Sequence, residues 1–253
     1  MTHRTSRFVA LGGLLTLAAL YAMNSLGYLG PNPIGSTSRA TAPLIVPAGY
    51  AFAIWGPIYI GLLIFPIYQL FKKREEHPAW IELRLWYAAN VVANGVWLAL
   101  ASYDQVWSTV AVIVFMLVSL FRINVLLNRI EAAGAPVNYW LERFVFYVYF
   151  AWVTLATVLN VASDLDFTGW DGGPLSAVTW TVVMMLVAAG IAGFTAWRFG
   201  SAAYAGVVVW AFVAICVKHA ETYSTIFYVA LAVAVLFSVL GVRLFSQPRL
   251  KMA

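Results

Sequence analysis

Charged residues and cysteine are scarce in this chain of 253 residues. Asp, Glu, Lys and Arg make up 10% of the residues, whereas 63% are hydrophobic. The core of a soluble protein could not bury so large a share of apolar side chains. The single cysteine, Cys216, excludes an intrachain disulfide and a zinc site built from several cysteines. We expect it to be a small packing residue in a helix. The composition therefore indicates an integral membrane protein.

Long apolar runs fill most of the chain, each about 20 residues long, as an α-helix needs to cross a bilayer. The sequence thus predicts an all-α integral membrane protein with eight transmembrane helices. The first run could also be a signal peptide, but no small-x-small cleavage site follows it, so we expect a retained helix. The predicted spans are Phe8–Gly27, Tyr50–Phe71, Trp80–Ser102, Val106–Leu127, Leu141–Ala162, Leu175–Trp197, Ala202–Lys218 and Tyr223–Phe245.

The distribution of Lys and Arg predicts the orientation, because cytoplasmic loops carry an excess of these residues. With the N-terminus inside, only Arg39 and Lys218 of the 15 basic residues lie on the outer side. The outer loops carry acidic residues such as Asp104 and Glu221. We therefore expect both termini in the cytoplasm, with the bacterial inner membrane as the location. The net charge of +5 reflects this topology, and nothing indicates a nucleic-acid partner.

Three spans present polar and aromatic groups on one face. Tyr149, Trp152, Ala156 and Asn160 fall on one narrow side of a helix, which suits a flat, mostly apolar ligand. Trp55 and Tyr59 form an i, i+4 pair that stacks on one face, although membrane interfaces also favour both residue types. Asn90, Asn94 and Trp97 share a third face. The two amides point inward, either to bond a neighbouring helix or to reach a ligand.

The segment Tyr28–Gly49 is the only long stretch that is not helical in the prediction, because its prolines and glycines forbid a regular helix. Its apolar patch, Leu44 to Val46, is unsuited to free exposure in water. We expect the segment to fold back as a lid over the helix ends; an ordinary exposed linker is the alternative.

These residues together resemble the successive signatures of the translocator protein family, also called tryptophan-rich sensory or peripheral benzodiazepine receptor-like proteins. The resemblance covers about Phe8 to Ser163, the family's five-helix unit. It predicts a five-helix membrane domain at 1–163 and a three-helix membrane extension at 164–253. The matching patterns are P-x7-W-x3-Y at Pro47, Trp55 and Tyr59, N-x2-W at Asn94 and Trp97, and Y-x2-W-x3-A-x2-L-N at Tyr149, Trp152, Ala156, Leu159 and Asn160.

The resemblance implies a pocket under the loop between the first two helices. Such a pocket binds tetrapyrroles such as protoporphyrin IX or haem without a covalent bond, and in animals sterols and synthetic ligands. The chain departs from the family pattern at Leu98, Ala99 and Val148, near which the family commonly has proline, and at Tyr50 and Phe52, which are offset by one. The expected ligand-binding residues are Trp55, Tyr59, Asn94, Trp97, Tyr149, Trp152, Ala156 and Asn160.

The last three spans carry few groups able to do chemistry. Lys218, His219 and Glu221 cluster at one turn, which fits a solvated helix end better than a proton relay. The aspartates at 164, 166 and 171 lack the spacing and the terminal Glu of a calcium loop, so we expect no metal site. We expect these spans to dock a partner or stabilise the protein, through small residues at Gly190, Gly193 and Ala196. Truncation after Gly173 should then leave tetrapyrrole binding by the first five helices largely intact while changing the oligomeric state or the retention of a partner.

Three functions fit the sequence. The favoured one is a membrane-embedded binding or sensory protein for a planar hydrophobic ligand, a tetrapyrrole. The second is a structural or accessory subunit, as a homodimer or in a larger membrane complex. The third is a tetrapyrrole transporter or degrading enzyme, which the near absence of charge inside the spans disfavours. The sequence shows no catalytic residues.

Overall fold

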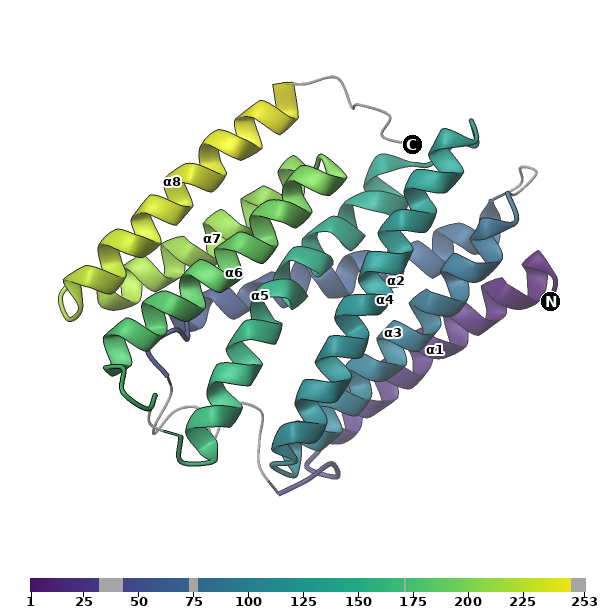
Figure 1. Ribbon diagram of the computed structural model, residues 1–253. Helices are drawn as coiled ribbons and strands as arrows, with labels where there is room; N and C mark the ends of the chain where they lie inside the picture. Colours follow the sequence, from purple (N-terminus) through teal and green to yellow (C-terminus); the bar gives the residue numbers. More distant parts are fainter. Residues whose placement is uncertain (32–42, 73–76, 171, 247–253) are drawn as a thin grey trace. The chain divides into compact units, whose positions relative to one another are not determined.

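The computed structural model describes residues 1–31, 43–72, 77–170 and 172–246 (Figure 1). These residues form helices and no strand, and eight helices are long and apolar enough to cross a membrane. The prediction of an all-α membrane protein is thereby confirmed. The elements are α1 (His3–Ser25), η1 (Gly49–Ile54), α2 (Trp55–Phe71), α3 (Ala79–Ser102), α4 (Val106–Ala132), η2 (Tyr139–Arg143), α5 (Phe144–Phe167), α6 (Ala177–Phe199), α7 (Ala202–His219) and α8 (Ser224–Ser246).

The chain divides into two compact units. Unit 1 contains helices α1 to α4 and the chain from there to Phe150, which includes η2 and the start of α5. Unit 2 contains the segment 43–54, the rest of α5 from Ala151, and helices α6 to α8. This division falls at 150/151, whereas the expected domain boundary lies at residue 163.

In unit 1, small residues allow α1 and α3 to approach closely. A Cβ atom on Gly13 would lie 2.9 Å from the Cα atom of Ala88, so only glycine fits at this contact. Asn90 on α3 donates a 2.6 Å hydrogen bond to the hydroxyl of Ser119 on α4. The Asn90 amide therefore bonds a neighbouring helix, which is the first of the two expected alternatives.

A buried ionic network joins helix ends of unit 1. The carboxylate of Glu142, with no exposed surface, accepts hydrogen bonds of 2.5 Å from both Lys72 Nζ and Gln69 Nε2. The buried guanidinium of Arg84 donates to Gln69 Oε1 at 2.5 Å and to Ser6 Oγ at 3.2 Å. Buried charges are costly unless they are paired, so each member of this network depends on the others.

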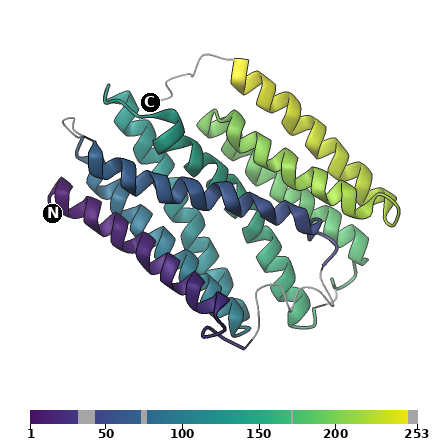
Figure 2. The same cartoon turned by 180° about the vertical axis from the view of Figure 1, so that it is seen from behind.

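In unit 2, helices α6, α7 and α8 lie side by side in both views (Figures 1 and 2). Gly200 ends α6 in a left-handed conformation (φ 58°), and the hydroxyl of Ser201 then caps α7 by accepting from Tyr204 N at 3.2 Å. Of the small residues expected at helix contacts, Ala196 is fully buried within the unit. Gly190 is exposed, and an added Cβ would meet nothing within 4 Å, so it makes no close helix contact among the described residues.

Candidate functional site

Unit 1 holds a cluster of aromatic rings around one amide. The rings of Trp55 and Tyr59 stack with centroids 5.2 Å apart and planes 16° from parallel, as their i, i+4 spacing predicts. The rings of Tyr149 and Trp55 meet in a T-shaped arrangement at a centroid distance of 5.9 Å. Asn94 donates from Nδ2 to the Tyr149 hydroxyl at 2.7 Å. Four of the expected site residues therefore lie together.

Tyr21 of α1 completes this cluster, and the sequence analysis did not single it out. Its hydroxyl is hydrogen-bonded to the hydroxyl of Tyr59 and lies 3.3 Å from Asn94 Oδ1. Both ends of the Asn94 amide thus have partners on other helices, as a polar group inside a membrane requires. Trp97 is partly buried on α3, three residues beyond Asn94. In the sequence, the only feature that could have pointed to Tyr21 is its hydroxyl group within the first apolar run.

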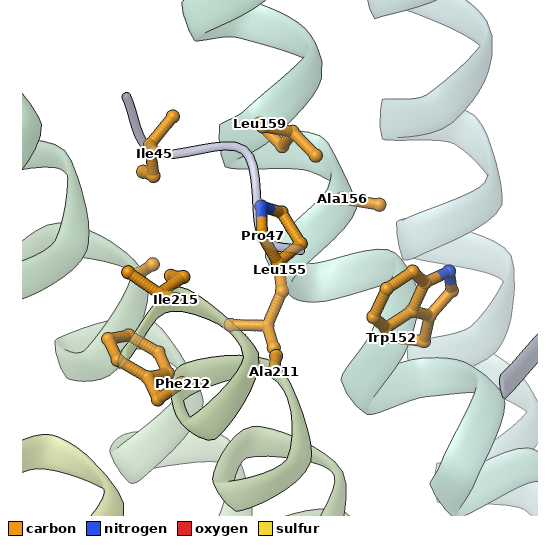
Figure 3. A pocket seen from close by; sticks show the side chains of 10 residues that line it. Ile45, Pro47, Trp152, Leu155, Ala156, Leu159, Ala211, Phe212 and Ile215 are labelled. Carbon is orange, nitrogen blue, oxygen red and sulfur yellow. The ribbon is translucent and has the colours of Figure 1, made fainter. Parts of the chain in front are cut away.

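Unit 2 holds an apolar cavity (Figure 3). Trp152 and Ala156, two of the expected site residues, line it from α5. Its volume is about 40 Å³, which is room for a few water molecules. The full lining consists of apolar side chains from the 43–48 segment, α5, α6 and α7, namely Ile45, Pro47, Trp152, Leu155, Ala156, Leu159, Ala188, Ala211, Phe212 and Ile215.

Trp152 is almost fully buried, and its indole meets the ring of Phe52 edge-on at a centroid distance of 5.7 Å. Ala156 lies one turn further along α5, and its small side chain also lines the cavity. Asn160 donates from Nδ2 to the carboxylate of Asp164 at 2.9 Å, and both side chains are buried. The Asn160 amide is therefore hydrogen-bonded to a residue four positions further along the same helix.

Residues 43–48, which we call the strap, cover the cavity. Ile45 and Pro47 are buried and line it (Figure 3). The strap hydrogen-bonds to α7 through Ala48 N and the carbonyl of Ala214 at 3.2 Å. These described residues fold back onto helices, as the sequence predicted for the lid. The rest of the expected lid, residues 32–42, lies outside the described residues.

Side chains of α7 hold the same segment at further points. Lys218 Nζ donates to the carbonyl of Val46 at 2.8 Å, and His219 Nε2 lies 2.7 Å from the carbonyl oxygen of Leu44. Because a carbonyl only accepts, Nε2 carries the hydrogen. The expectation of a solvated helix end is therefore wrong for His219, which is buried under the strap. Lys218 is only partly buried, and Glu221 is exposed.

Helices α6 and α7, which belong to the expected C-terminal extension, also form part of the cavity wall. Ala188 of α6 and Ala211, Phe212 and Ile215 of α7 line it together with Trp152 of α5. Trp152 and Ala156 therefore line the same cavity as side chains of α6 and α7. The effect of truncation after Gly173 stays a prediction.

The eight spanning-length apolar helices of the described residues define a helical integral membrane protein. The chain belongs to the TSPO-like protein family, whose family model matches residues 7–243. The match includes α6 to α8, so the relationship extends beyond residue 163, where the sequence resemblance was expected to end. Comparisons with curated proteins and with solved structures gave no match.

Proposed function

We propose that this protein binds a planar hydrophobic ligand within the membrane, a tetrapyrrole such as a porphyrin or haem, and acts as a binding or sensory protein. The observation that carries the proposal is the position of Trp152 and Ala156. These signature residues meet at an apolar cavity under the strap. An aromatic face beside a small residue suits a flat ring, because the ring can stack on the indole and occupy the space beside the small side chain.

Binding at this cavity requires the strap to move. A tetrapyrrole ring is much larger than the cavity of about 40 Å³. Ile45 and Pro47 of the strap form part of the lining, and hydrogen bonds rather than covalent links hold the strap to α7. The proposed cycle is therefore release of the strap, entry of the ring against Trp152, and closure of the strap over it.

The proposal includes an orientation, with both termini in the cytoplasm of a bacterial cell and the strap at the outer side. The excess of Lys and Arg on one side of the predicted spans supports it. In this orientation the α7–α8 turn, with Glu221, lies outside, and the α4–α5 connection, with Ala133, lies inside.

Titration of the purified protein with protoporphyrin IX tests the ligand proposal. The protein is kept in lipid nanodiscs, and tryptophan fluorescence is recorded as porphyrin is added. We expect saturable quenching with a stoichiometry near one per chain, because the ring would lie against Trp152. Quenching that rises linearly and equally in empty nanodiscs containing a soluble tryptophan analogue would contradict the proposal.

A further inference from the structure

A cationic end adjoins the apolar cavity of unit 2. Ala211, Phe212 and Ile215 line the cavity from α7, and Lys218 and His219 follow Ile215 by three and four residues. Residues at these spacings share a helix face, so the two polar side chains continue the lining stripe of α7. The strap residues Leu44 and Val46, whose carbonyls they bind, flank Ile45, which itself lines the cavity.

The charge of Lys218 is not balanced by the residues that the structure describes. Its ammonium group is partly buried and has no carboxylate within ion-pair distance in the described ranges. Its one hydrogen bond there goes to a neutral acceptor, the Val46 carbonyl. An ammonium group can donate three hydrogen bonds, so two remain for another acceptor. The site thus combines an apolar chamber with an unpaired cation at its end.

We propose that the ligand of this cavity is an apolar carboxylic acid, whose carboxylate binds Lys218 while its hydrophobic body lies against Trp152. The inference rests on the proposed function and names the chemical class of its ligand. A carboxylate at Lys218 would form a charge-assisted hydrogen bond, which is about twice as strong as the bond to the Val46 carbonyl. The Val46 carbonyl can keep its own hydrogen bond, because the ammonium group has two further hydrogens to donate.

His219 is a positioning residue in this arrangement. Its side chain is 2% exposed, its Nε2 atom donates to the Leu44 carbonyl, and its Nδ1 atom lies 3.4 Å from the hydroxyl of Thr222. With both ring nitrogens engaged, the imidazole fixes the strap at Leu44. Lys218 alone therefore supplies the cation for the ligand.

The test compares protoporphyrin IX with its dimethyl ester, which keeps the ring and removes both negative charges. We expect the wild-type protein to bind the free acid about tenfold more tightly than the ester. Lys218→Met should abolish this preference, because it weakens binding of the acid relative to that of the ester. Lys218→Arg should retain the preference. This result would show that the loss in Lys218→Met comes from the missing charge and not from misfolding.

Arg243→Met is the matched control, because it removes one positive charge from an exposed position on α8 of the same unit. We expect it to keep the full preference for the acid. Equal binding of acid and ester to the wild-type protein would overturn the inference and leave the proposed function intact. A preference that survives in Lys218→Met would also overturn it. Failure of both compounds to bind would overturn the proposed function together with this inference.

Discussion

The imidazole of His219 and the carbonyl of Leu44 lie 2.7 Å apart, although 175 residues separate them in the chain. This hydrogen bond joins the end of α7 to the strap. With the bonds from Lys218 and Ala214, it closes the segment over the cavity that Trp152 lines. Helix α7 therefore holds the segment that covers a cavity lined by family-signature residues.

Trp210→Phe should loosen the segment that follows the strap. The indole Nε1 of Trp210 donates to the Ala51 carbonyl at 3.0 Å, and phenylalanine removes only this donor while keeping a ring beside Tyr50. A net hydrogen bond contributes about 0.5–1.5 kcal/mol, so amide exchange in residues 43–51 should become about 2- to 10-fold faster. Hydrogen exchange with mass spectrometry measures this. Trp197→Phe, on an exposed face of α6, is the control and should leave exchange unchanged.

Trp152→Ala should weaken tetrapyrrole binding by about 1 to 3 kcal/mol, because it removes a buried aromatic contact. Fluorescence of the porphyrin itself gives the affinity without relying on tryptophan. Trp197→Ala removes an indole that is 58% exposed and should have no effect. If both variants keep the wild-type affinity and remain folded, Trp152 serves helix packing only.

Filling the cavity from either wall should block the ligand. Ala156→Leu adds volume from α5, and Ala211→Leu adds it from α7, so both should reduce porphyrin affinity about tenfold or more by overpacking. Val217→Leu makes a similar change at a residue of α7 that is 57% exposed, and it should bind normally. An effect of Ala156→Leu without one of Ala211→Leu would mean that α7 does not border the ligand.

Glu142→Gln should destabilise unit 1 by about 3–5 kcal/mol, because it leaves the buried ammonium of Lys72 without its anionic partner. Glu82→Gln is the matched control, since Glu82 and its partner Arg122 are 41% and 44% exposed, and such a pair contributes only about 0–1 kcal/mol. Denaturant unfolding in detergent gives both values. Equal effects of the two substitutions would contradict the assignment of Glu142 to a buried network.

Cysteine labelling in intact cells should show the orientation. On a Cys216→Ala background, Glu221→Cys should react with a membrane-impermeant maleimide, and Ala133→Cys should react only after lysis. Both positions are exposed, so a difference between them reports the side of the membrane. The reverse pattern would place the strap in the cytoplasm and invert the proposed topology.

The sequence by itself determined the helices and the family relationship. Each predicted span matches a helix to within a few residues, because an apolar run of spanning length can satisfy its backbone only as a helix in a bilayer. The stacking of Trp55 on Tyr59 was equally predictable, since an i, i+4 pair meets through local helix geometry alone.

Only the tertiary structure decided which faces meet. The contacts of α7 with the strap, and of Tyr21 with Tyr59 and Asn94, join segments far apart in the chain, and no local period encodes them. For the same reason Lys218 was expected in water, whereas folding places it against the Val46 carbonyl. Local hydrophobic pattern specifies a helix, but the partner of each helix face depends on side-chain packing between distant segments.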